Sequence, residues 1–294
     1  MSNSRCEPIR VAGVPEHFNL PWHLAIESGS FEERGLDVRY VDYPGGTGAM
    51  TRALGQGEVD VAILLAEGAV ADLIRRRQTR LVKVYVRSPL IWGIHVADDS
   101  EITSIDQIRD RTYAISRPGS GSHLMAIVDA SERGWNTDDL DFEVVRNLDG
   151  ARKALADDEA DIFLWEKFTT QPFVDNGEFR RVGHRETLWP AFVIAVNADV
   201  LMNRRDDIRS MLEVINRQCD QLMKNPEAIQ LVATRYQLEE SQVREWLSLT
   251  RWSTDFECPH DSIQKILKYL NHLEIIDAPD ATVNEVWEDL NNND

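Results

Sequence analysis

The first third of the chain alternates short apolar segments with segments of helical length, and this alternation restricts the possible folds more than any other feature. Strand patterns occupy residues 9–14, 36–43, 59–66 and 81–88, with helix patterns near 20–34, 46–56 and 68–77. Strands joined by helices of this length form βαβ units, because two parallel strands need a crossover connection between them. The sequence therefore predicts an α/β fold with a mostly parallel sheet.

The same pattern starts again in the middle of the chain. New strand patterns lie at 112–116, 141–145, 161–165 and 180–183, preceded by an apolar strand at 92–97 and followed by one at 192–196. A chain of 294 residues is longer than a typical domain of roughly 100–200 residues. We expect residues 1–97 with 195–294 to form lobe one and residues 98–194 to form lobe two. The region after residue 199 is expected to be helical and to cover lobe one.

Composition argues against two classes of partner. The formal net charge is −18, whereas nucleic acids and anionic membranes attract basic surfaces. No apolar stretch reaches the length of about 18 residues expected of a membrane-spanning helix. The first residues lack the apolar core of a signal peptide, so the expected location is the cytoplasm, or the periplasm if a leader has been removed. Cys6, Cys219 and Cys258 show no metal-ligand spacing, so we expect free thiols, no metal and no cofactor.

Several segments together resemble a known family. They are ESGSFEERGLDVRYVDYPGGTGAM at 27–50, GEVDVAIL at 57–64 and the helix start PGSGS at 118–122. These segments are similar to the type 2 periplasmic binding proteins, in the branch that takes nitrate, sulfonates, taurine and thiamine pyrimidines. The resemblance implies a two-lobed fold with two hinge strands, here 92–97 and 192–196. It also implies closure on a small-molecule ligand in a cleft between the lobes, with an ABC permease as a possible partner.

The candidate ligand-binding residues follow from the strand pattern. Ligands of open parallel sheets bind beyond the carboxyl ends of the strands, where loops lead into helices. In lobe one the candidates are Glu16, His17, Phe18, Asn19, Gly45, Gly46, Thr47, Glu67 and Ser88. In lobe two they are Arg117, Gly119, Ser120, Gly121, Ser122, Trp165 and Glu166.

These candidates favour two different ligands. The small residues at the helix starts offer backbone amides to an anionic group such as a sulfonate or carboxylate, although Thr47, Ser120 or Ser122 could simply be N-caps. Glu67 and Glu166 could instead accept hydrogen bonds from an amino group on a flat ring, although carboxylates are also common in the first turn of a helix. A buried carboxylate beside an anion is costly, so a pyrimidine-like heterocycle is the preferred prediction.

The sequence contains no recognisable catalytic motif. Ser120 and Ser122 lie beside His123, but neighbours in sequence do not place a base on a nucleophile, and no GxSxG elbow occurs. The thiamine-pyrimidine synthases that the chain resembles carry a cysteine-rich motif where this sequence reads FLWEKF at 163–168. We therefore expect a binding protein rather than an enzyme. The alternative is a thiamine-pyrimidine-related or other small-molecule enzyme built on the same fold.

Overall fold

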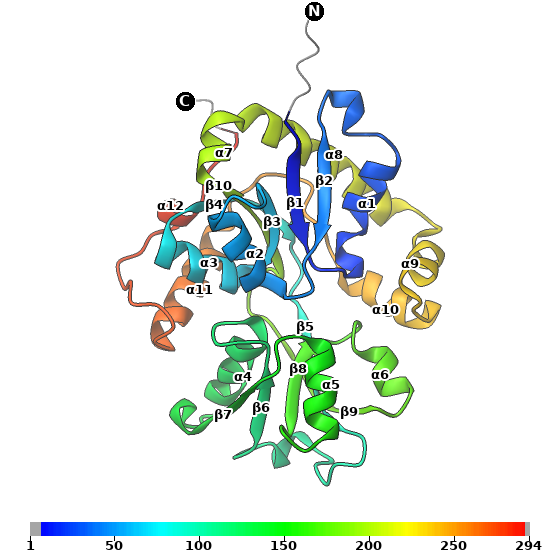
Figure 1. Ribbon diagram of the computed structural model, residues 1–294, viewed down its shortest axis with the longest axis vertical. Helices are drawn as coiled ribbons and strands as arrows, with labels where there is room; N and C mark the ends of the chain where they lie inside the picture. Colours follow the sequence, from blue (N-terminus) through cyan, green and yellow to red (C-terminus); the bar gives the residue numbers. More distant parts are fainter. Residues whose placement is uncertain (1–6, 292–294) are drawn as a thin grey trace, which may run out of the picture. The chain divides into compact units, whose positions relative to one another are not determined.

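A computed structural model describes residues 7–291 and divides the chain into two compact units (Figure 1). The first unit combines the residues up to Ser88 with those from Trp189 onward, and the second unit runs from Pro89 to Leu188. Each unit contains one five-stranded mixed sheet with helices packed on it. Within residues 7–291 no helix is both long enough and apolar enough to cross a membrane.

The sheet of the first unit has the strand order β2-β1-β3-β10-β4. Its strands are β1 (Ile9–Gly13), β2 (Val38–Asp42), β3 (Val61–Leu65), β4 (Thr79–Val86) and β10 (Phe192–Asn197). β1 is parallel to both β2 and β3, whereas β10 runs antiparallel to β3 and β4. The carboxyl ends of these three parallel strands therefore lie at the same end of the sheet, where the loops that follow them enter helices.

Helices from both ends of the chain cover this sheet. They are η1 (His17–Asn19), α1 (Leu20–Glu27), η2 (Glu32–Arg34), α2 (Gly46–Gly55), α3 (Ala66–Arg76), α7 (Ala198–Asn203), α8 (Arg205–Lys224), α9 (Ala228–Tyr236), α10 (Glu240–Leu249), α11 (His260–His272) and α12 (Val283–Val286). α8 packs on α1, and α11 and α12 pack on α3 (Figure 1). The C-terminal helices thus belong to the first unit, which confirms the expectation from the sequence.

The second unit repeats this arrangement, with the strand order β7-β6-β8-β5-β9. Its strands are β5 (Ile91–Ala97), β6 (Thr112–Ile115), β7 (Asp141–Val144), β8 (Ile162–Glu166) and β9 (Phe179–Glu186). Its helices are η3 (Ile105–Gln107), α4 (Gly121–Glu132), η4 (Thr137–Asp139), α5 (Leu148–Ala156) and α6 (Gln171–Asp175). β6 is parallel to β7 and β8, and β5 is antiparallel to β8 and β9.

The boundaries of the units differ from those expected. The sequence placed residues 92–97 in lobe one, but β5 pairs with β8 and β9 and so belongs to the second sheet. The chain crosses between the units before β5, near Ser88, and returns at Trp189 rather than at 195. An apolar strand is equally suited to either sheet, so its local pattern does not reveal its partners. Both sheets are mixed, but four of the five strands in each run in the same direction, and only β10 and β5 run opposite to their neighbours.

Candidate functional site

The loop after β1 buries three of its four candidate residues. His17, Phe18 and Asn19 are buried, whereas Glu16 is partly exposed. The carbonyl oxygen of Phe18 accepts hydrogen bonds from the Tyr85 hydroxyl at 2.8 Å and from Trp252 Nε1 at 3.0 Å. These two bonds fix the loop against β4 and against the segment that follows α10.

The His17 ring lies within an aromatic cluster contributed by distant parts of the chain. Its centroid is 4.2 Å from that of Trp246 and 6.0 Å from that of Tyr236, while Phe18 lies 5.3 Å from Trp246. Burial lowers the pKa of His17 to about 3. The imidazole is therefore neutral at physiological pH and can offer one donor and one acceptor nitrogen.

Four buried polar atoms around this cluster lack a partner among the described residues: His17 Nε2, Asn19 Oδ1, Tyr236 Oη and Trp246 Nε1. The other end of the Asn19 amide is satisfied, because Nδ2 donates to the carbonyl of Val14 at 2.8 Å. Buried polar groups in proteins are nearly always hydrogen-bonded to protein, water or ligand. The loop after β1 therefore retains hydrogen-bonding capacity that the protein itself does not use.

The glycines before α2 form a tight turn rather than a capped start. Gly46 has φ +63°, which favours glycine, and no side chain caps the helix at Gly45. Thr47 is buried and its hydroxyl accepts from the backbone N–H of Leu65 at 3.0 Å. The alternative of an N-cap at Thr47 is therefore wrong. The residue instead ties the first turn of α2 to the end of β3.

Glu67 lies in the first turn of α3 and is 1% exposed. Its Oε2 accepts from the indole N–H of Trp189 at 2.7 Å, and its Oε1 has no partner among residues 7–291. Burial raises the pKa of Glu67 to about 7. Ser88, after β4, is partly exposed and its hydroxyl accepts from the backbone N–H of Arg251 at 3.1 Å.

At the start of α4, after β6, the two serine hydroxyls accept hydrogen bonds from backbone N–H groups of the same segment. Ser120 is the N-cap of α4 and accepts from the backbone N–H of His123 at 3.4 Å, as the N-cap alternative predicted. The Ser122 hydroxyl accepts from the backbone N–H of Ser116 at 3.0 Å. Gly119 has φ +75° and donates its N–H to Nδ1 of His123 at 3.0 Å.

The rest of this loop is less enclosed. Arg117 is partly exposed, and its backbone N–H reaches Ser120 Oγ at 3.4 Å. Gly121 opens α4 and is buried. The first amides of any α-helix have no intrahelical partner, and since Ser120 takes up that of His123, the amides of Gly121 and Ser122 are the ones that could meet an anion.

Glu166 and Trp165 end β8. Glu166 is 4% exposed, and its Oε2 accepts from the backbone N–H of Thr169 at 2.6 Å, so it closes the turn that follows the strand. Burial raises the pKa of Glu166 to about 7. The Trp165 ring stacks on Phe163 at 5.2 Å and packs against the apolar core of the second unit.

Within each unit, the candidates lie beyond the strand ends from which they were predicted, and contact with a ligand stays a prediction. Trp189, Tyr236 and Trp246 were missed, because each reaches its partner only through the tertiary fold. Among residues 7–291 no cluster of His, Cys, Asp and Glu could hold a metal ion. Cys219 and Cys258 are free thiols, and Cys6 lies outside the described residues.

Comparison with known proteins identifies the class of this fold. A protein-family model described as Ca3427-like PBP matches residues 92–185, which make up most of the second unit. The structure of the Candida albicans CA3427 gene product, described as having the generic periplasmic binding protein fold, is 25% identical with a TM-score of 0.85, covering 95% of this chain and 93% of the other. No curated protein matches the sequence.

Two sulfonate-binding proteins share the fold at lower identity. The alkanesulfonate-binding protein SsuA from Xanthomonas axonopodis pv. citri, bound to MOPS, is 14% identical with a TM-score of 0.80, covering 97% of this chain and 99% of the other. The periplasmic aliphatic sulphonate-binding protein SsuA from Escherichia coli is also 14% identical, with a TM-score of 0.69 and coverages of 97% and 93%.

The fold is thus the two-lobed α/β architecture of solute-binding proteins. The chain thus resembles the type 2 periplasmic binding proteins, as its sequence implied, in its overall fold and in the match of its second unit to a family model of this class.

Proposed function

We propose that this chain binds one small organic solute and does not transform it. The binding residues lie at the carboxyl ends of the strands in its two sheets. The match of the second unit to a periplasmic binding protein model and the shared fold support a solute-binding role. The observation that carries the proposal is the Glu67 carboxylate, which has one oxygen bonded to Trp189 and, within the described chain, one buried oxygen without a partner. An unsatisfied buried acceptor costs about 1–3 kcal/mol, so a ligand N–H at Oε1 would recover that free energy on binding.

The preferred ligand is a flat heterocycle that carries an amino group, such as a pyrimidine. Its amino group would donate to Glu67 Oε1, a carboxylate in a site where an anion would be costly. The neutral His17 and the rings around it suit a flat, uncharged partner, since aromatic faces gain from stacking. Glu166 is assigned a smaller part, because the turn after β8 already occupies one of its oxygens.

A sulfonate or carboxylate is the second candidate ligand. The glycine- and serine-rich start of α4 offers backbone amides, and Arg117 precedes it with a guanidinium group. The shared fold with two sulfonate-binding proteins favours the same class. This candidate leaves Glu67 Oε1 without a partner, which is why it ranks second.

The proposal includes closure of the two units on the ligand, with the two connections near Ser88 and Trp189 as hinges. In a transport role the loaded protein would deliver its solute to an ABC permease. The catalytic alternative, an enzyme of thiamine-pyrimidine or related metabolism, would use the same strand ends but would release a changed molecule.

Native mass spectrometry of freshly purified protein, followed by a thermal-shift screen of pyrimidines, sulfonates and carboxylates, tests the proposal. A ligand that binds only the folded state raises the melting temperature. An aminopyrimidine should stabilise the wild type. Glu67→Gln should reduce that shift, because Trp189 would keep the one amide oxygen and the amide nitrogen left facing the ligand cannot accept a hydrogen bond. Glu58→Gln, an exposed site in the same unit, is the matched control and should keep the shift.

Two results would contradict parts of the proposal. If sulfonates stabilise the protein, Glu67→Gln leaves that shift intact and pyrimidines do nothing, the heterocycle assignment is wrong. If the recovered ligand has changed mass after incubation, the protein is an enzyme.

A further inference from the structure

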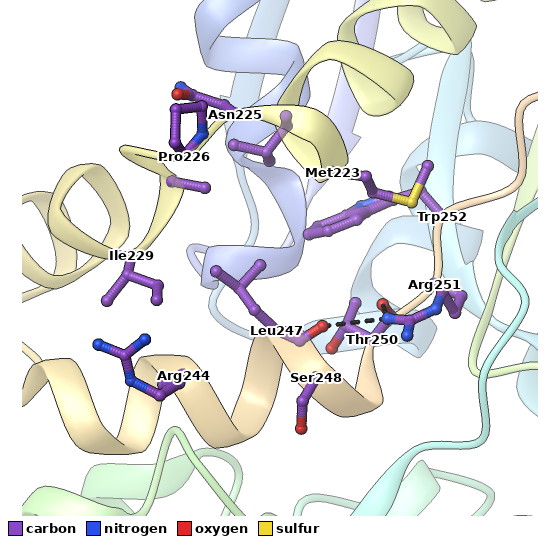
Figure 2. Close-up of a pocket in the computed structure, with 12 residues that line it drawn as sticks. Met223, Asn225, Pro226, Ile229, Arg244, Leu247, Ser248, Thr250, Arg251 and Trp252 are labelled. Carbon is purple, nitrogen blue, oxygen red and sulfur yellow. Dashed lines mark hydrogen bonds between the residues drawn. The ribbon is translucent and has the colours of Figure 1, made fainter.

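A hollow lies in the helical part of the first unit, and none of the strand-end candidates is among its lining residues. It has a volume of about 490 Å³ and is lined by residues from the end of α8, the start of α9, the second half of α10 and the segment just after it (Figure 2). This volume is within the range of about 300–1,000 Å³ that is usual for small-molecule sites. Neither the strand-end candidates nor the solute proposed above occupy it.

The walls of this pocket combine apolar and polar side chains. Leu222, Met223, Ile229, Leu247 and Trp252 contribute their side chains to it. Trp252 is 4% exposed, and its indole N–H is already bonded to the Phe18 carbonyl at 3.0 Å. It therefore presents a ring face with no spare donor, which suits an alkyl chain rather than a polar group.

The charge of the lining is the opposite of that of the chain. Arg244 and Arg251 line the pocket and no Asp or Glu does, although the chain has 50 acidic and 32 basic residues. Arg251 donates to the carbonyls of Leu247 at 3.2 Å and Thr250 at 2.7 Å, so its guanidinium group is held at the end of α10. Arg244 is exposed and has no hydrogen bond or ion pair among the described residues.

The two arginines of the lining lie on either side of Leu247. Figure 2 shows Arg244 extending from α10 toward Ile229, with Arg251 on the other side of Leu247. Guanidinium binds carboxylate, sulfonate or phosphate oxygens through paired, charge-assisted N–H donors, whereas a neutral acceptor gains a weaker hydrogen bond and a cation is repelled.

We propose that this pocket is a second binding site, for an amphipathic organic anion with an aliphatic chain and a carboxylate or sulfonate head. The chain would pack on Leu247 and Trp252 and the head would pair with Arg244. The ring centroid of Trp252 lies 5.5 Å from that of Trp246, and that of Trp246 lies 4.2 Å from that of His17, so Trp252 and Trp246 connect the pocket to the aromatic cluster around His17.

Calorimetric titration of the full chain with octanesulfonate and octanoate tests this site, with octylammonium and octanol as probes of the head group. Both anions should bind, octanol should bind at least about tenfold more weakly, and octylammonium should not bind, because an ion-paired head contributes roughly a factor of ten or more. Arg244→Gln should weaken anion binding by about tenfold or more. Ser248→Glu should do the same by placing a negative charge on the exposed rim, at a helical position where the fold tolerates it.

Arg109→Gln is the control, since it removes an exposed arginine of the second unit and should leave anion affinity unchanged. Octanesulfonate that binds with equal affinity to wild type and Arg244→Gln would place the anion elsewhere, for instance at α4, and would overturn the proposal. Equal binding of octanol, or no anion binding at millimolar concentration, would also overturn it. Glu67→Gln should not change octanesulfonate affinity, so failure here is distinguishable from failure of the proposed solute site.

Discussion

Replacing Glu67 with glutamine should change how stability depends on pH. Burial raises the pKa of Glu67 from 4.5 to about 7, so between these values the folded state holds a proton that the unfolded state has lost. Stability contributed by this group is therefore complete below pH 4.5 and decreases as the pH rises toward 7. For these two pKa values, the loss between pH 5.5 and pH 8 amounts to about 2 kcal/mol. Glutamine does not ionise and removes this loss.

The assay is urea unfolding of wild type and Glu67→Gln at several pH values from 5.5 to 8, which avoids the sequence pI near 4.8. The free energy of unfolding of the variant, minus that of wild type, should rise by about 2 kcal/mol across this range. Glu58→Gln, at an exposed position, is the control and should give a flat difference. A flat difference for Glu67→Gln, or one that falls, would refute the assignment of a raised pKa to a buried, half-paired carboxylate.

Three further predictions follow from burial, backbone geometry and the proposed closure. Burial lowers the pKa of His17 to about 3, so as the pH falls from 7.5 to 5.5 the unfolded state gains a proton that the folded state does not. The free energy of unfolding of wild type should therefore fall by about 1 kcal/mol relative to that of His17→Phe. A difference in urea unfolding that stays constant over this range would contradict this. A Cβ at Gly150 would lie 1.8 Å from the Val145 carbonyl oxygen, whereas at Gly35 it meets open space with φ +74°. Gly150→Ala should therefore lower the melting temperature much more than Gly35→Ala, which costs about 1 kcal/mol, and equal shifts would refute the clash. Small-angle scattering should give a smaller radius of gyration with bound solute, and an unchanged radius with a confirmed tight ligand would argue against hinge closure.

The loops at the strand ends show which features of the site a local sequence pattern can predict and which it cannot. The sequence predicts that Glu67 directly follows an apolar strand, because the hydrophobic pattern changes there from that of a strand to that of a helix. The sequence does not predict the hydrogen bond between Glu67 and Trp189, which lie 122 residues apart. The burial of His17 was equally hidden, since Trp246 and Tyr236 come from helices more than 200 residues further along the chain. Local periodicity carries no information about which distant surface covers a loop.

The sequence by itself determined the α/β class, the presence of two units, the helical C-terminal region and the resemblance to type 2 periplasmic binding proteins, because strand and helix periods and helix-start residues are local properties. Only the tertiary structure decided that β5 joins the second sheet and that Thr47 bonds to Leu65 rather than capping α2. It also decided which polar atoms at the strand ends keep no partner of their own. These outcomes depend on which surfaces meet after folding, and the free energy of each pairing is set by burial and geometry that neighbouring residues do not encode.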